Sequence, residues 1–221
     1  MTLTKRTQLD RRTETQRLLI DSATRLFGER GYEATSLEDI AQDCGLTTGP
    51  IYHYYGSKKE LFRVVHDTAL EGTFVELRRP HAADLKDHMQ QQLKITFDLY
   101  REPSLFRILL VDGRNILGEG RWSEEQFRAQ LRISLGSSKK INTRELTALR
   151  VLYAAVREAI LMLAEADNQT AMRRHLIEVI NPMLEIVAAQ LEAAGGHYAA
   201  QHAQDARPAP AKKARRAQRP A

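Results

Sequence analysis

Hydrophobic residues recur at intervals of three and four through most of residues 12–194, and this spacing places apolar side chains on one face of an α-helix. No stretch alternates apolar and polar residues, or is rich enough in β-branched residues, to predict a strand. The pattern therefore predicts an all-α protein. Its first helix should end at Gly31, because glycine readily adopts the left-handed conformation that follows a helix end. The apolar face of that helix consists of Leu19, Ala23, Leu26 and Phe27.

A long helix should begin at Ser57, since Ser57 and Glu60 have the spacing of a capping box. It should run to residue 79, because Pro80 cannot continue it. The other expected elements in this part are helices over 84–101, 104–117 and 123–135 and a Gly-Ser-Ser linker at 136–138.

Two strongly patterned helices close the predicted fold. Their apolar residues form narrow stripes that run from Leu146 to Leu163 and from Leu176 to Leu191. Pro182 lies inside the second stripe and should kink or break the helix, because it removes one backbone hydrogen bond. Two interpretations of the stripes are open: core packing within one subunit, or a dimer interface made of two helices per subunit. The interface interpretation assigns Leu149, Val156, Ile160, Leu163, Ile180, Met183, Val187 and Leu191.

The chain divides into four parts on this pattern. We expect a flexible arm over residues 1–11, a helical head over 12–62 and a second helical domain over 63–196. Residues 197–221 are rich in Ala, Pro, Gln and basic residues, and they lack the apolar side chains needed to offset the entropy of ordering. A disordered tail is therefore expected there.

Composition narrows the class of protein. The single cysteine, Cys44, excludes an intrachain disulfide and favours a reducing cytoplasm. The polar N-terminus lacks a secretory signal, and the longest apolar stretch, 151–166, is interrupted by Arg157 and Glu158, so no membrane segment is expected. The seven histidines lack the spacing of metal ligands, and we expect neither a metal nor a cofactor.

The net charge of +5 is concentrated at one end of the chain. Residues 205–221 contain six Lys or Arg and one Asp, which leaves 27 basic and 27 acidic residues in the rest. The body of the protein is therefore not generally basic. Any contact with nucleic acid must depend on a few placed groups, and the tail would add only a sequence-independent contribution.

Residues 37–55 read LEDIAQDCGLTTGPIYHYY and have the spacing of a helix-turn-helix. Ala41 would lie where the two helices cross closely, and Gly45 would take the positive φ that the turn requires. The small shared core would consist of Ile40, Cys44, Leu46, Ile51 and Tyr55.

The second helix of this motif is expected to have Thr47 as its N-cap. Pro50 then falls in the first turn, where its missing amide hydrogen has no intrahelical partner to lose. Gly49 removes a side chain where the helix start would approach a partner. Hydroxyl and imidazole groups on the outward face can donate hydrogen bonds to DNA phosphates. The expected outward-facing residues are Thr48, Tyr52, His53 and Tyr54.

Two groups beside this helix could meet the same phosphates. Lys58 carries a positive charge at the start of the next helix. Ser36 is a candidate N-cap of the preceding helix, but Thr35 with Glu38 forms an equally good capping box, so the identity of the cap stays open.

The stretch TRLFGERGYEATSLEDIAQDCGLTTGPIYHYYGSKKELF, residues 24–62, resembles the TetR family of bacterial transcriptional regulators without a gap. The resemblance implies an all-helical homodimer, a DNA-reading head, and a divergent C-terminal domain that binds a small effector. It places Thr48, Gly49 and Tyr52 at base edges or the nearby backbone, and Tyr54 and Lys58 at phosphates. The candidate DNA contacts are then Ser36, Thr47, Thr48, Gly49, Tyr52, His53, Tyr54 and Lys58.

Residues 104–122, SLFRILLVDGRNILGEGRW, are similar to a stretch that recurs in the C-terminal domain of one branch of this family. Asp112 and Arg114 interrupt its apolar run, and they either face a cavity or cap and pair locally at the surface. Aromatic residues nearby could line an effector pocket or belong to the core. The effector-binding candidates are Phe97, Tyr100, Phe106, Asp112, Arg114, Trp122, Phe127 and Tyr153.

These observations predict a homodimeric repressor that binds a pseudo-palindromic, double-stranded DNA operator and leaves it when a small molecule occupies the C-terminal domain. Activation in place of repression is also open. One alternative is a helical enzyme or ligand-binding protein that carries this head, although no nucleophile, base and orienting group stand together in the sequence. Another is an architectural DNA binder driven by the basic tail.

Overall fold

The computed structural model describes residues 8–77, 84–118, 127–128, 131 and 142–193. Every regular element in these residues is a helix, which confirms the all-α prediction. The expected end of the long helix at residue 79, most of the helix at 123–135, the linker at 136–138 and the tail lie outside the described residues. The elements are α1 (Gln8–Arg30), α2 (Leu37–Asp43), α3 (Gly49–Tyr55), α4 (Lys58–Leu77), α5 (Leu85–Leu99), α6 (Pro103–Phe106), the π-helix η1 (Arg107–Asp112), α7 (Gly113–Leu117), α9 (Thr143–Glu165) and α10 (Gln169–Ala193).

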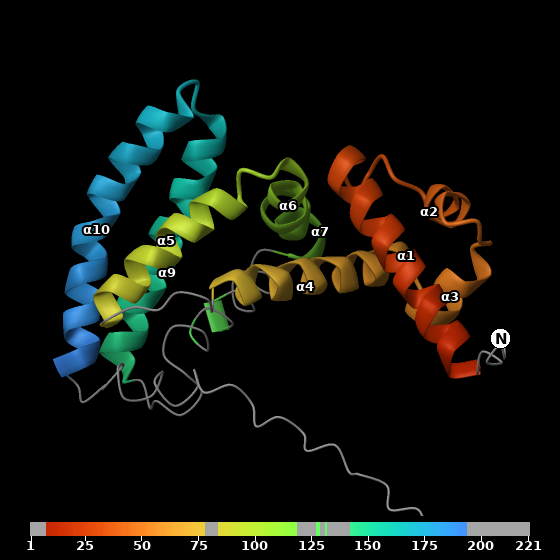
Figure 1. Cartoon of the computed structure of the whole chain (residues 1–221), viewed down its shortest axis with the longest axis horizontal. Coiled ribbons are helices and arrows are strands. Elements are labelled where there is room, and N and C mark those ends of the chain that lie inside the picture. Colours follow the sequence, from red (N-terminus) through yellow and green to blue (C-terminus); the bar gives the residue numbers. More distant parts are fainter. Residues whose placement is uncertain (1–7, 78–83, 119–126, 129–130, 132–141, 194–221) are drawn as a thin grey trace, which may run out of the picture.

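The helices form two regions joined by α4. Figure 1 shows α1, α2 and α3 at one end of the molecule and α5, α9 and α10 at the other, with α6 and α7 between them above α4. We call α1–α3 the head and α5, α9 and α10 the distal bundle. Ser57 caps α4 as predicted, because its hydroxyl oxygen accepts a hydrogen bond from the Glu60 amide at 3.2 Å.

The head begins earlier than the sequence pattern suggested. Helix α1 starts at Gln8, so residues 8–11 belong to the helix, and the prediction of a flexible arm reaching residue 11 is wrong. The first turns are polar and escape a search for hydrophobic periodicity. They are stabilised locally, since Arg17 forms ion pairs with Glu14 at 2.9 Å and with Asp21 at 2.8 Å along the helix surface.

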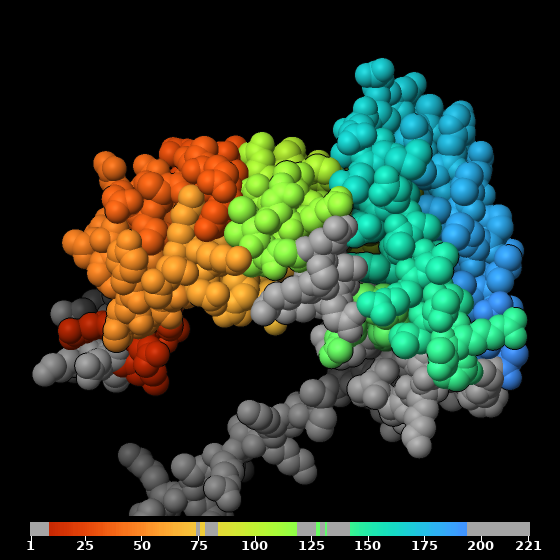
Figure 2. All heavy atoms as spheres, turned by 180° about the vertical axis from the view of Figure 1, so that it is seen from behind, coloured from red at the N-terminus to blue at the C-terminus, as the bar shows by residue number. Residues whose placement is uncertain are grey.

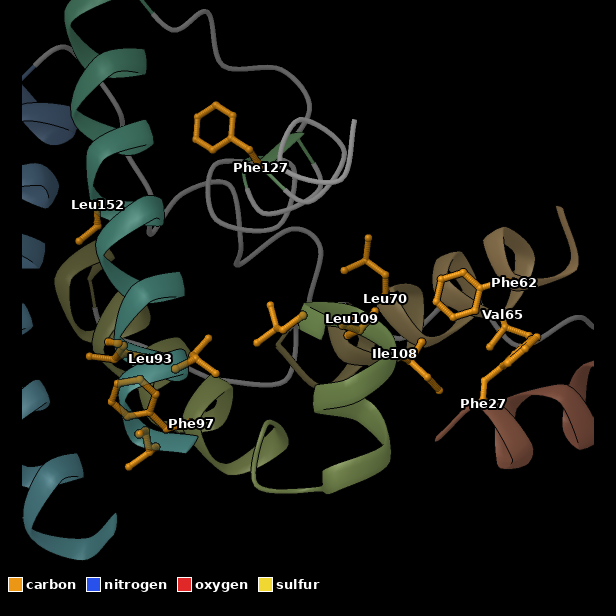
Figure 3. Close-up of a cluster of buried hydrophobic side chains, with 14 of the residues drawn as sticks. Phe27, Phe62, Val65, Leu70, Leu93, Phe97, Ile108, Leu109, Phe127 and Leu152 are labelled. Atoms are coloured by element: carbon orange, nitrogen blue, oxygen red, sulfur yellow. The ribbon is translucent and has the colours of Figure 1, made fainter. Parts of the chain in front are cut away.

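One hydrophobic core extends through both regions. Phe27 of α1 packs against Phe62 of α4, with ring centroids 5.2 Å apart. Figure 3 follows this core from Phe27 past Leu70 and Leu109 to Leu93 and Leu152. Because the head shares buried side chains with α4 and η1, it is packed onto the rest of the chain and is not a separately tethered unit.

The stretch 104–117 is helical throughout, as predicted, but its middle is the π-helix η1, Arg107–Asp112. A π-helix accommodates one extra residue per turn and occurs often at functional positions. Helix α10 also differs from expectation. It continues through Pro182 as a single helix of 25 residues, so the proline does not break it.

The apolar stripes of α9 and α10 lie in the core of one subunit. Six of the eight residues assigned to a dimer interface are at most 7% exposed, so that assignment is wrong for them, and the core interpretation describes them. Val156 and Met183 are partly buried against the same core. The six are Leu149, Ile160, Leu163, Ile180, Val187 and Leu191.

No helix among the described residues is long and apolar enough to cross a membrane. Those residues also contain no cluster of three or more His, Cys, Asp or Glu side chains that could hold a metal ion.

Candidate functional site

Helices α2 and α3 form the predicted helix-turn-helix. Ala41 is 3% exposed at the crossing of the helices, and Ile40 and Ile51 are fully buried behind them. Gly45 has a φ of 68° in the turn, a conformation that costs other residues free energy. The Leu46 amide donates to the Ala41 carbonyl at 2.8 Å and closes the turn.

Ser36 is the cap of α2, which settles the alternative left open by the sequence. Its hydroxyl oxygen accepts from the Asp39 amide, and the Asp39 carboxylate accepts from the Ser36 amide at 2.9 Å and hydroxyl at 2.6 Å. These donors hold the pKa of the Asp39 carboxyl below its usual range. Thr35 instead is buried and donates to the Gly31 and Leu26 carbonyls at the end of α1. The Ser36 hydroxyl is thus engaged within the head, and its DNA contact stays a prediction.

Helix α3 begins at Gly49, with Thr48 as its N-cap in place of the predicted Thr47. The Thr48 carbonyl accepts from the Ile51 and Tyr52 amides at 3.0 and 3.2 Å, while its side chain makes no capping hydrogen bond. Pro50 still lies in the first turn, where proline is tolerated. Thr47 is exposed just before the helix.

The outward face of α3 is polar and aromatic. Tyr52 is 55% exposed and His53 is also exposed, whereas Tyr54 is half-buried. The Tyr54 ring packs edge-on against His53 with centroids 4.9 Å apart. A Cβ on Gly49 would lie 3.7 Å from its nearest side-chain atom, the Thr47 hydroxyl, so nothing inside the subunit demands glycine there. Clearance for an external partner is a role that fits this position.

Two basic side chains flank α3. The Lys58 ammonium lies 4.2 Å from the centroid of the Tyr32 ring, and the Arg12 guanidinium lies 5.7 Å from that of Tyr54. Both distances are within the range of cation–π attraction, which holds a charge in a defined place. Lys58 was predicted as a DNA contact, but Arg12 was missed. The sequence shows the basic pair Arg11-Arg12. It does not reveal that Arg12 lies on a helix beside α3.

A polar cluster fixes α2 onto α1. The Ser22 hydroxyl lies 2.6 Å from the Asp43 carboxylate and 3.2 Å from the Ile40 carbonyl, and Arg25 forms an ion pair with Asp43. The Ser22 hydrogen bond and then the Arg25 contact hold the pKa of the Asp43 carboxyl below its usual range. This cluster orients the helix that supports α3.

A second polar cluster joins the head to η1. The Arg107 guanidinium donates to the Gly28 carbonyl at 2.7 Å and to the Glu29 carbonyl in the last turn of α1, where a cation also complements the helix dipole. The Asp112 carboxylate accepts from the Tyr32 amide at 2.8 Å. We call these contacts the junction. They show that Asp112 pairs with the head, and Asp112 is not part of the described lining of the cavity below.

A cavity of about 110 Å³ lies in the part of the molecule that contains the distal bundle. Its walls come from α4, α5, η1, α9 and α10, together with Phe127 and Leu131. Three of the eight effector-binding candidates line it: Tyr100, Phe127 and Tyr153. Phe97 is fully buried in the core, Phe106 is half-buried against that core and Arg114 is exposed. None of these three lines the cavity, and Trp122 lies outside the described residues.

Polar side chains that were not predicted as a group also line the cavity. Gln92, Thr96 and Tyr100 follow one another at four-residue intervals on α5 and around its end, and Tyr153 and Arg157 do so on α9. A search for polar residues at helical spacing inside an apolar face would have found them. Burial raises the pKa of the Tyr100 and Tyr153 hydroxyls, so both stay neutral hydrogen-bond donors at physiological pH.

Comparisons with known proteins agree with both regions. Residues 19–65 match the family model described as bacterial regulatory proteins, tetR family, and residues 87–187 match a tetracyclin repressor-like C-terminal domain. The transcriptional repressor AcnR of Corynebacterium glutamicum is 27% identical over 136 residues, which cover 56% of this chain and 72% of AcnR.

Solved structures of regulators share the fold. A TetR-family regulator from Pectobacterium atrosepticum has a TM-score of 0.65 at 23% identity, covering 83% of this chain and 98% of its own. The structure of RolR with the ligand resorcinol has a TM-score of 0.55 at 20% identity, covering 92% and 98%. The helix-turn-helix geometry and both family matches lead to one conclusion: the chain belongs to the TetR family of bacterial transcriptional regulators.

Proposed function

We propose that this protein is a homodimeric repressor of the cytoplasm that binds a pseudo-palindromic operator through α3 and leaves it when a small molecule fills the cavity. The observation that carries the proposal is the division of α3 into two faces. Ile51 is fully buried while Tyr52 and His53 are exposed one and two residues later. A seven-residue helix with exposed aromatic and imidazole groups, held by buried residues behind it, suits insertion into a major groove.

The DNA contacts follow from exposure and charge. Tyr52 and His53 project from the outer face of α3, and Gly49 leaves room for close approach of the DNA to its first turn. Lys58 and Arg12, on either side, would hold phosphates. Thr47, Thr48, Tyr54 and Ser36 complete the proposed contact set. Few of these side chains can form two hydrogen bonds to one base edge. Recognition would therefore depend partly on contacts with thymine methyl groups and on DNA shape.

We propose that the homodimer forms through the outer face of α9 and α10, not through their buried stripes. Figures 1 and 2 show the two helices together at the end of the molecule remote from the head. Val179 and Ile186, seven residues apart on one face of α10, are 65% and 60% exposed. On α9, Val151 and Met162 are 57% and 44% exposed. Apolar side chains gathered on two packed helices favour an interface between identical copies.

In this proposal, the junction transmits a structural change at the cavity to the head and so to the bound DNA. Leu110 of η1 lines the cavity, and its neighbours Arg107 and Asp112 contact the end of α1 and Tyr32. A ligand that binds one arrangement of η1 more tightly than another would shift the position of the head. In a dimer, that shift changes the distance between the two α3 helices, which must match successive major grooves.

Selection of bound sequences from a random DNA pool tests the proposal. Full-length protein at near-physiological salt should enrich an inverted repeat. Retention of DNA without enrichment would contradict sequence-specific reading and favour binding driven by the basic tail. Tyr52→Ala and Lys58→Ala should each weaken binding to the selected site by roughly tenfold or more. Arg174→Ala removes a positive charge from an exposed position on α10 and should leave binding unchanged.

Sedimentation analysis tests the dimer separately. Val179→Glu and Ile186→Glu place charges on the proposed interface and should give monomers that keep their helical circular dichroism. Leu9→Glu is the matched control, because Leu9 is 71% exposed on α1, far from α10. A dimer that survives both α10 substitutions would exclude this face as the interface.

A further inference from the structure

The described lining of the cavity contains few polar side chains. Its walls are mostly aliphatic and aromatic, and Arg157 is the only charged side chain among the described residues that line it. No Asp or Glu is present in that described lining. A cationic ligand would meet a like charge there in a low-dielectric space, whereas an anionic group would meet an opposite one.

The side-chain hydroxyls that line the cavity with Arg157 are those of Thr73, Thr96, Tyr100 and Tyr153. The Thr73 and Thr96 hydroxyls already donate to the Ala69 and Gln92 carbonyls of their own helices, at 3.0 and 2.7 Å, so toward a ligand they offer acceptor lone pairs only. Tyr153 lies one helical turn before Arg157 on α9, and both Arg157 and Tyr100 are close enough to Tyr153 to influence its ionisation. The Arg157 guanidinium and the Tyr100 and Tyr153 hydroxyls are thus donors in the lining of one cavity.

A second hollow adjoins this cluster from the surface side of α9. It shares Phe127, Tyr153 and Arg157 with the cavity and adds Arg150. The Arg150 guanidinium lies 5.4 Å from the centroid of the Phe127 ring, and that ring packs edge-on against Tyr153 at 5.7 Å. Phe127 lies beside α9 in Figure 3. Arg157 therefore lines both the hollow and the cavity, and Arg150 lines the hollow; basic side chains favour the approach of an anion.

We propose that the cavity binds a compact aromatic carboxylate, with the carboxylate on Arg157 and the tyrosine hydroxyls and the ring among the apolar walls. This inference rests on the proposed function, in which the cavity is the effector site. The volume of about 110 Å³ is comparable with an apolar protein cavity of about 150 Å³ that holds benzene. The aromatic rings of Phe127 and Tyr153 favour a flat ring as the ligand body.

Titration calorimetry of full-length protein with three planar probes tests the ligand class without DNA. Benzoate, benzamide and benzamidine have nearly the same shape and carry a negative, zero and positive charge. Benzoate should bind about tenfold tighter than benzamide, because a charge-assisted hydrogen bond is stronger than a neutral one. Benzamidine should give no heat of binding. Equal or tighter binding of benzamide or benzamidine would overturn the proposal, as would no binding by benzoate, phenylacetate and cinnamate alike.

Variants of Arg157 locate the site. Arg157→Gln should abolish the preference for benzoate over benzamide, and Arg157→Lys should retain it in weaker form. Arg174→Gln, a loss of the same charge from an exposed position on the neighbouring helix, should leave it intact. A preference that persists in Arg157→Gln would overturn the proposed site. Arg157→Lys keeps the test interpretable if the glutamine variant fails to fold.

A DNA-release assay separates this inference from the proposed function. If benzoate binds and dissociates the protein from its selected operator, both proposals are supported. If it binds through Arg157 and leaves the operator complex unchanged, the ligand class stands and the effector role of the cavity falls. If the protein releases the operator only for ligands without a carboxylate, the proposed function stands and the ligand class is overturned.

Discussion

The head and the distal bundle differ in what their buried and half-buried polar side chains contact. In the head, such groups pair with one another: Ser36 with Asp39, and Ser22 with Asp43. Helices of seven residues are too short to be stable alone, and these contacts fix α2 in place. In the distal bundle, the helices α9 and α10 have 23 and 25 residues, and the buried Glu145 forms a capping box with Asn142 at the start of α9. Other polar groups there, such as Tyr100 and Arg157, line a cavity, which the head does not contribute to.

This difference assigns rigidity and adaptability to separate parts of the molecule. A DNA-reading helix must hold its geometry, since a tilt of α3 would misplace every contact along it. A ligand cavity needs spare volume, which lowers packing density and the free energy of unfolding. The junction between Arg107, Asp112 and the end of α1 connects the two parts. The comparison predicts that substitutions in each part will have separable effects.

The largest effect is expected where the distal bundle is densely packed. Phe97 is fully buried on α5, and Phe97→Ala should lower the free energy of unfolding by about 3–5 kcal/mol through the cavity it creates. Tyr100→Phe, three residues later, removes only the hydroxyl of a residue that lines the existing cavity and should cost less than about 1 kcal/mol. Urea denaturation followed by circular dichroism measures both. Similar losses would mean that Tyr100 belongs to the packed core and that the cavity is not spare volume.

The next effect concerns the contact between α1 and α6. A Cβ on Gly28 would lie 2.5 Å from the Ser104 Cβ and 3.3 Å from its Cα, so Gly28→Ala should destabilise the protein by about 1–3 kcal/mol through overpacking. Gly72→Ala is the matched control. Gly72 lies in α4 with no atom within 4 Å of the added Cβ, so alanine there should stabilise the helix by about 0.5–1 kcal/mol. In thermal unfolding, the melting temperature should fall in Gly28→Ala and rise in Gly72→Ala.

The head could be predicted closely because its determinants are local. Ala41, Gly45 and Ile51 lie within eleven residues of one another, and their spacing alone implies the turn and the buried side of α3. The cap of α2 was left open between Thr35 and Ser36, since both have suitable partners three residues later. The structure favours Ser36 because Thr35 is needed at the end of α1.

The distal bundle was harder to predict because its contacts are distant in sequence. Hydrophobic periodicity identified the apolar sides of α9 and α10, but it cannot tell whether the partner of Leu149 or Ile180 lies in the same chain or in another. The partner of Asp112 is the Tyr32 amide, 80 residues earlier, and no local pattern reveals such a pairing. Likewise Gln92 and Arg157 meet at the cavity only after α5 and α9 have packed.

Loss of the junction should have an intermediate effect on stability and a specific effect on signalling. Arg107→Met keeps the aliphatic stem and removes the hydrogen bonds to Gly28 and Glu29, so the protein should lose about 1–2 kcal/mol of stability. Ligand affinity measured without DNA should not change, while the ligand-induced loss of operator affinity should shrink. Arg114→Met, at an exposed position on α7, is the control. An unchanged ligand response in Arg107→Met would exclude the junction as the connection between the two regions.

The smallest expected effect concerns Asp43 in the polar cluster of the head. Its contribution to the stability of the protein should depend on pH. Ser22 and Arg25 hold the pKa of the Asp43 carboxyl below its ordinary value, so ionised Asp43 stabilises the folded state. That contribution is present above the unfolded pKa of about 4 and is lost as the pH falls through the lower folded pKa. Asp43→Asn should therefore have a lower melting temperature than wild type at pH 7, and the difference should shrink below pH 4.

Asp21→Asn is the control on α1, because it removes an exposed ion pair with Arg17 whose contribution is small at any pH. A difference between wild type and Asp43→Asn that stays constant from pH 7 to pH 3 would mean that shape, not charge, matters at this position. The head would then be held rigid mainly by its apolar core, as the distal bundle is. In that case the contrast between the two regions would reduce to the presence of a cavity in one of them.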